Sequence, residues 1–133
     1  MLDTTTATTA LALTAPASEE ITTMAQAQTL RHALTETGLP MAWVRAKDPQ
    51  TFYRETLGIA SKADYLAFKA ALKSWLRAMA KGQRVYKDAM HQPGGNGTAQ
   101  MWAHNAAHAI TMLIEIRRAT RTCAGLDRAA NAA

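Results

Sequence analysis

The stretch SKADYLAFKAALKSWLRAMAKGQRVYK, residues 61–87, decides the fold of this chain, because it has the pattern of one long amphipathic helix. Large apolar side chains recur at three- and four-residue spacing: Tyr65, Phe68, Leu72, Leu76 and Met79. Residues at this spacing share one face of an α-helix, so this face is predicted to be buried. Ser61 and Asp64 match a capping box, which predicts the start of the helix. Gly82 is expected to interrupt or kink it.

The opposite face of this predicted helix is basic. We call its six cations the basic stripe: Lys62, Lys69, Lys73, Arg77, Arg84 and Lys87. At one turn per 3.6 residues they fall within a sector about 80° wide. Acids that would pair with them across one turn are nearly absent, since Asp64 and Asp88 lie at the helix ends. The stripe is therefore expected to face either solvent alone or an anionic partner, of which phosphate is the commonest.

Helix signals also occur before the basic stretch. Ser18 is a suitable cap, two glutamates follow it, and apolar residues then recur at helical spacing as far as Leu34. Gly38 and Pro40 are expected to end this helix. The segment MAWVR, residues 41–45, is then expected to be a loop or a single turn anchored by Trp43.

Two further helices complete the pattern. Asp48 followed by Pro49 predicts the start of a short helix, which Gly58 ends. After the glycine-rich connector HQPGGNG, residues 91–97, the last helix is expected to start at Thr98 and to stop near Gly125.

These elements predict an all-α protein, a small helical bundle of about five helices. No segment alternates with period two for long enough to indicate a strand. Residues 1–17 are rich in threonine and alanine and are expected to be disordered. The helical domain should then cover residues 18–125, and residues 126–133 should form a flexible tail.

Composition and charge narrow the class of protein. The chain has 133 residues, of which 48% are hydrophobic, and a net charge of +5. Residues 1–60 hold six acids and four bases, whereas residues 61–133 hold four acids and eleven bases. Such asymmetry points to nucleic acid or another anionic surface. Alanine contributes much of the apolar fraction, so the core should be thin, and we expect a homodimer in which a second copy covers apolar surface.

The sequence contains no pattern typical of several other classes of protein. Cys123 is the only cysteine, which leaves no internal disulfide and fits a reducing cytoplasm. Arg118 and Arg121 could lower the pKa of its thiol, but no histidine or acid near it in sequence would make it a nucleophile. No apolar run is long enough to span a membrane. With no phosphate-binding loop and no paired carboxylates, we expect a protein without catalysis or cofactor.

A histidine pair offers a possible metal site. His104 and His108 are one helical turn apart and can chelate one ion. Zinc proteases carry a glutamate directly after the first histidine, but here Asn105 stands in that position and cannot accept a proton. A third strong ligand is not evident nearby. The two histidines are therefore expected to be surface or interface residues, with metal binding as the alternative.

A helix-turn-helix outline is present in residues 52–68, where a short helix, Gly58 and a capped second helix follow one another. Arg54 occupies a position where this motif favours a small residue, and Asp64 one where it favours an apolar residue. The second helix also begins without Arg, Asn or Gln to contact base edges. Non-specific or accessory binding is thus favoured over recognition of a base sequence.

The sequence leads to three hypotheses for function. The first is a small basic protein whose stripe contacts the phosphates of DNA or RNA, supported by three arginines of the last helix, Arg117, Arg118 and Arg121. These arginines extend the surface only if the two helices are neighbours. The second is a helical adaptor that docks on an acidic protein through the same face. The third is a metal-binding helical protein that uses His104 and His108.

Overall fold

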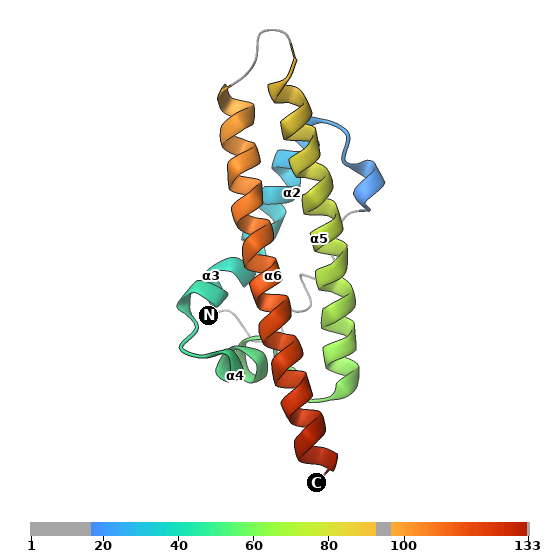
Figure 1. Ribbon diagram of the computed structural model, residues 1–133, viewed down its shortest axis with the longest axis vertical. Coiled ribbons are helices and arrows are strands. Elements are labelled where there is room, and N and C mark those ends of the chain that lie inside the picture. Colours follow the sequence, from blue (N-terminus) through green and yellow to red (C-terminus); the bar gives the residue numbers. More distant parts are fainter. Residues whose placement is uncertain (1–16, 93–96, 133) are drawn as a thin grey trace.

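A computed structural model describes residues 17–92 and 97–132 (Figure 1). In this part of the chain every regular element is helical, which confirms the predicted small all-α bundle. Five of these elements are α-helices: α2 (Met24–Glu36), α3 (Leu39–Arg45), α4 (Pro49–Thr51), α5 (Lys62–Met90) and α6 (Gly97–Ala132). A 3₁₀ turn, η1 (Ser18–Glu20), precedes them, and a π-helical turn, η2 (Phe52–Thr56), follows α4.

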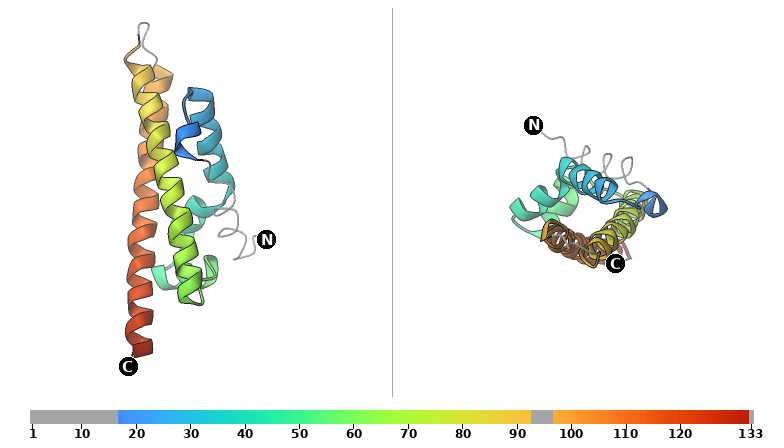
Figure 2. Two further views of the ribbon diagram at one scale, coloured as in Figure 1. Left: turned by 90° about the vertical axis from the view of Figure 1, so that its right-hand side faces the viewer. Right: turned by 90° about the horizontal axis from the view of Figure 1, so that it is seen from above.

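The two longest helices, α5 and α6, run antiparallel and form a hairpin (Figure 1). The helix α2 packs against α5, while α3 and α4 pack against α6. Viewed along the long axis, α2 covers one side of the hairpin, and no other described helix covers the opposite side (Figure 2). The hairpin therefore has one face in the core and one face open to solvent.

The predicted apolar face of α5 forms the centre of the core. Phe68 and Trp75 have no exposed surface, and Leu72 and Met79 are almost as deeply buried. They pack with residues of the other helices, which include Leu30 of α2. Each of these large side chains is worth about 1.5–3 kcal/mol when removed from water. This burial explains why α5 stays one helix over its full length.

The first helix begins later than expected. Ser18 opens only the short turn η1, and α2 starts at Met24 with Thr23 as its cap. The hydroxyl of Thr23 accepts a hydrogen bond from the backbone N–H of Gln26 at 3.2 Å. The side chain of Gln26 accepts in return from the N–H of Thr23 at 3.0 Å. This reciprocal capping box satisfies two helix-end donors, which Ser18 does not do.

The helix α2 ends before Gly38, as predicted, but Pro40 does not stop the chain from being helical, and MAWVR is neither the expected loop nor a single turn. Gly38, with φ of 75°, follows α2, and a new helix, α3, begins at the next residue. Pro40 lies in the first turn of α3, where a backbone N–H has no acceptor within the helix. Proline, which lacks this N–H, therefore loses no hydrogen bond there. Trp43 does act as an anchor, because its ring packs edge-on against Phe52 with 5.1 Å between the centroids.

Both predicted caps that position α4 and α5 are present. The carboxylate of Asp48 accepts from the N–H of Thr51 at 2.8 Å. The hydroxyl of Ser61 accepts from the N–H of Asp64 at 3.1 Å, and the carboxylate of Asp64 accepts from the N–H of Ala60 at 3.0 Å. These contacts fix the point at which the basic helix leaves the preceding turn.

Two glycines do not end or interrupt their helices as expected. The helix α5 continues past Gly82, and α6 continues past Gly125 to Ala132. Residues 126–132 are therefore helical, and the predicted flexible tail is wrong for them. The predicted disordered segment 1–17 lies, apart from Ala17, outside the described residues, as do residues 93–96 of the connector.

Candidate anion-binding surface

The six cations of the basic stripe are all exposed on α5. From Lys62 to Lys87 the stripe extends about 38 Å, at 1.5 Å per residue. Within residues 17–92 and 97–132, the ion pairs are His32 with Glu36 and Arg54 with Asp127. No stripe cation is thus paired with an acid of the described chain. Solvent ions or an anionic partner would relieve the repulsion between these cations.

The last helix lies beside the stripe, as the first hypothesis requires. The helices α5 and α6 pack along much of their length (Figure 1). Arg117, Arg118 and Arg121 are all exposed on α6. Arg121 lines the same cavity as Lys62 and Lys69 of the stripe. Arg117 and Arg118 line none of the described cavities and lie one turn nearer the middle of the hairpin.

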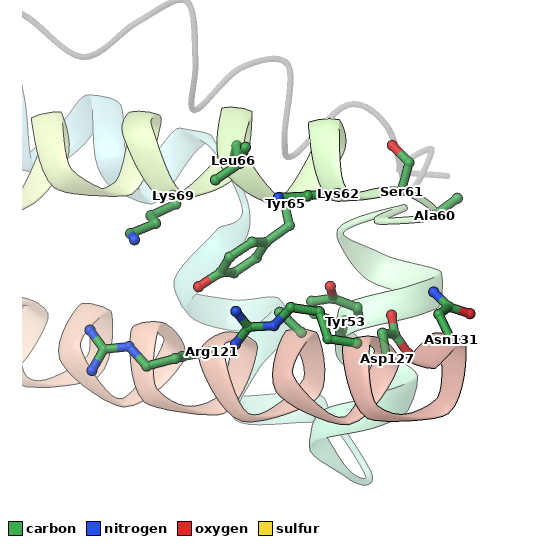
Figure 3. A pocket seen from close by; sticks show the side chains of 12 residues that line it. Tyr53, Ala60, Ser61, Lys62, Tyr65, Leu66, Lys69, Arg121, Asp127 and Asn131 are labelled. Carbon is green, nitrogen blue, oxygen red and sulfur yellow. The ribbon is translucent and has the colours of Figure 1, made fainter. Parts of the chain in front are cut away.

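The cavity has a volume of about 330 Å³ and lies where the start of α5 faces the end of α6 (Figure 3). Four cations line it, two from each helix: Lys62, Lys69, Arg121 and Arg128. Sequence reasoning missed Arg128 because it fell within the predicted tail. Its spacing of seven residues from Arg121 places both on one face of a helix, which was the signal available.

The walls between these cations are largely apolar. Tyr53 of η2 and Tyr65 and Leu66 of α5 contribute to them (Figure 3). Ala124 of α6 also lines the cavity. Burial raises the pKa of the Tyr53 hydroxyl, and the nearby charge of Asp127 raises it further. Tyr53 is therefore neutral at physiological pH, and its hydroxyl keeps the proton that it can donate.

Asp127 is the one acidic residue among the described residues that line this cavity. Its Oδ1 lies 2.5 Å from Nη2 of Arg54, which approaches from η2. This partner offsets the negative charge of Asp127. The four cations of the cavity are paired with no acid of the described chain, so the cavity remains electropositive.

The histidine pair is exposed, as expected. The rings of His104 and His108 meet edge to face with 4.8 Å between their centroids. Glu115, further along α6, accepts a hydrogen bond from the indole of Trp43 at 3.2 Å. In the described part of the chain, no group of three His, Cys, Asp or Glu side chains is placed to hold a metal ion. The metal hypothesis thus rests on two imidazoles.

The pKa of the Cys123 thiol is raised, and Arg118 and Arg121 do not lower it. Its side chain is buried against the core, and this burial raises the pKa of the thiol. The charge of Asp127 adds to the increase, and Arg54 offsets it only in part. Arg118 and Arg121, which the sequence places close by, point from the exposed side of the helix.

Comparison of the chain with protein-family models, with curated proteins and with solved structures finds no match in any of the three. Within the described residues, none of the helices combines the length and the apolar character needed to cross a bilayer.

Proposed function

We propose that this protein binds nucleic acid by contacting its phosphates with the basic stripe. The observation that carries the proposal is the set of six exposed stripe cations on the single helix α5, none of them paired with an acid of the described residues. The exposed arginines Arg117, Arg118 and Arg121 on the adjacent helix extend the positive surface. A polyanion that covers this surface removes the repulsion between the cations and releases its own counterions.

The geometry of the stripe favours backbone contact over base recognition. Lys69, Lys73 and Arg77 follow one another at about 6 Å along the helix axis. The phosphates of one DNA strand advance by about 3.4 Å along the duplex axis, so cations about 6 Å apart face a backbone that offers at least one phosphate per cation. The start of α5 offers Lys62 and Asp64 but no Arg, Asn or Gln that would read base edges as a recognition helix does. The binding is therefore independent of sequence, as suits an accessory factor.

The test is a fluorescence anisotropy titration of the full chain with a labelled random-sequence duplex, a single strand and an RNA hairpin. If all six stripe cations contact phosphates of the duplex, the slope of log K against log salt concentration is about −5. Lys73→Glu combined with Arg77→Glu should reduce this slope by about 2 and weaken binding at low salt at least about tenfold. Whichever of the duplex, the single strand and the RNA hairpin binds most tightly indicates the kind of nucleic acid that the protein prefers.

A matched control separates local contacts from net charge. Arg45→Glu combined with Lys47→Glu changes the net charge by the same amount, at exposed positions in and just after α3. This variant should keep most of the affinity. Absence of binding to all three nucleic acids at low salt contradicts the proposal. So does a control variant that loses as much affinity as the stripe variant.

An acidic protein surface is the second candidate partner. Leu66 falls within the basic stripe and is 48% exposed, which suits a partner with apolar as well as acidic side chains. This candidate predicts no affinity for nucleic acid and capture of a protein by the wild type and by the Arg45/Lys47 control. The Lys73/Arg77 variant should fail to capture it.

We also propose that the protein acts without catalysis, in the cytoplasm and as a homodimer. A buried, reduced Cys123 is compatible with that compartment. Metal binding by His104 and His108 is the third candidate, and stoichiometric metal in untagged protein that His104→Ala removes would support it.

A further inference from the structure

The cavity between the start of α5 and the end of α6 has the size of a small-molecule site. Its volume of about 330 Å³ lies within the range of roughly 300–1,000 Å³ that such sites occupy. Three segments that are distant in sequence build it: η2, α5 and α6. The capping contacts of Ser61 and the ion pair of Arg54 with Asp127 hold these segments in place.

Cationic groups gather at one end of the cavity. Figure 3 shows the side chains of Lys69 and Arg121 extending from facing helices toward the same end. The side chain of Arg128 extends toward Gly125, one turn earlier on α6. A Cβ added at Gly125 would lie 3.9 Å from Nη2 of this arginine. Guanidinium groups bind phosphate oxygens through paired, charge-assisted hydrogen bonds. This end of the cavity is suited to a phosphate group.

The middle and the far end have a different chemistry. The ring of Tyr65 and the side chains of Leu66 and Ala124 form apolar walls on which a planar ring can stack. Asp127 and Asn131 lie at the end away from Lys69 and Arg121 (Figure 3). Their amide and carboxylate groups can hydrogen-bond to the polar edge of a heterocycle.

From this order of groups we infer that the cavity binds a phosphomonoester that carries a planar heterocycle, the chemistry of a nucleoside monophosphate. The phosphate lies between Lys69 and Arg121, and the ring lies against Tyr65. Two sources present this chemistry: a free mononucleotide, and the 5′-phosphorylated end of a strand bound along the stripe. The second source rests on the proposed function, because Lys62 and Lys69 belong to both sites, whereas the first source does not.

Isothermal titration of the full chain with adenosine monophosphate, adenosine and inorganic phosphate tests the site itself. The monophosphate should bind at least about tenfold more tightly than either fragment, since only it fills both ends of the cavity. Arg121→Gln combined with Arg128→Gln should abolish this preference. Arg45→Gln combined with Lys47→Gln removes two exposed cations that do not line the cavity and should leave this preference unchanged.

Single strands that differ only in a 5′-phosphate or a 5′-hydroxyl distinguish the two sources. A preference for the phosphorylated strand that the Arg121/Arg128 variant loses assigns the site to strand ends. Binding of the monophosphate without such a preference assigns it to free nucleotides. If the protein shows neither result, or if the Arg45/Lys47 control loses as much of the preference as the Arg121/Arg128 variant, the inference is wrong. Because Lys73 and Arg77 do not line the cavity, loss of 5′-hydroxyl strand binding in their variant tests the stripe separately.

Discussion

Arg54 and Asp127 join the turn η2 to the end of α6, with 2.5 Å between Nη2 of the arginine and Oδ1 of the aspartate. Asp127 lines the cavity and Arg54 does not, so the arginine offsets from outside the only acidic charge among the cavity's described lining residues. The side chains of the pair are 58% and 34% exposed, so water screens the interaction. The contribution of the pair to the electrostatics of the cavity should therefore exceed its contribution to stability.

Arg54→Met should lower the free energy of unfolding only slightly. A double-mutant cycle with Asp127→Asn is expected to give a coupling energy below about 1 kcal/mol, as for other exposed pairs. The same Arg54→Met change leaves Asp127 uncompensated and should weaken adenosine monophosphate binding several-fold. Urea unfolding and calorimetric titration measure the two effects. A coupling well above this value, with unchanged ligand affinity, would show that the pair is structural.

Gly82→Ala should stabilise the protein by up to about 1 kcal/mol, the difference in helix propensity between the two residues. The added Cβ would lie 3.5 Å from Cβ of Ala27 and 3.7 Å from Cδ2 of Leu30, which is ordinary contact. Gly82→Leu has no such room against α2 and should destabilise the protein. Urea unfolding of both variants checks the two signs. Destabilisation by alanine would mean that α2 and α5 cannot accommodate one methyl group.

Gly82 also shows where sequence reasoning reached its limit. The spacing of Phe68 and Trp75 is local information, so the buried face of α5 was predictable from it. Gly82 was expected to bend the helix because a glycine is locally weak there. Its actual place beside Ala27 depends on the packing of α2, which no local pattern contains. Tertiary packing likewise extends α6 past Gly125.

The candidate site also has one part that was predictable from the sequence and one part that was not. The stripe follows from one helical repeat and was found in full, whereas its binding to phosphate stays a prediction. The cavity was not found, because Tyr53, Lys69 and Arg128 come from three separate elements. Only the antiparallel packing of α5 on α6 brings Lys69 and Arg128 to one cavity. Local patterns therefore predict surfaces on single helices better than sites between helices.

Tyr86→Phe should leave the stability unchanged or raise it by about 1 kcal/mol at neutral pH. The hydroxyl of Tyr86 is buried, with the residue 1% exposed, and it has no hydrogen-bond partner among the described residues. The ring itself stacks on Trp102 with 6.4 Å between centroids, and phenylalanine preserves this contact. Thermal or urea unfolding gives the sign, and a clear loss of stability would reveal a partner for the hydroxyl.

The same residue predicts a pH dependence. Burial raises the pKa of Tyr86 in the folded state, with Arg31 opposing the shift. The stability that the neutral phenol contributes is fully present below the unfolded-state pKa of about 10. This contribution is lost as the pH rises from there through the folded-state pKa. The wild type should lose stability more steeply than Tyr86→Phe in this alkaline range. Equal slopes in urea unfolding at neutral and alkaline pH would contradict the assignment.

Cys123 should react slowly with a thiol reagent in the native protein at neutral pH. Its residue is 5% exposed, and burial raises the pKa of the thiol, so little thiolate is present and the reagent reaches it poorly. Ellman's reagent should detect one thiol per chain in denaturant and far slower release in buffer. Arg118→Gln should leave the native rate unchanged, because its charge does not activate the thiol. Fast native labelling would show that the end of α6 opens readily.

The predicted homodimer should have about twice the monomer mass of 14.4 kDa in size-exclusion chromatography with light scattering. Met41 and Val44 of α3 are 53% and 65% exposed, and their spacing of three residues places them on one face. A second copy that covers apolar surface should cover these two, so Met41→Lys combined with Val44→Lys should yield a monomer. Leu126→Lys, at an exposed leucine of α6, serves as the control and should leave the dimer intact. A wild-type monomer at every accessible concentration would show that the single-chain core around Trp75 is sufficient.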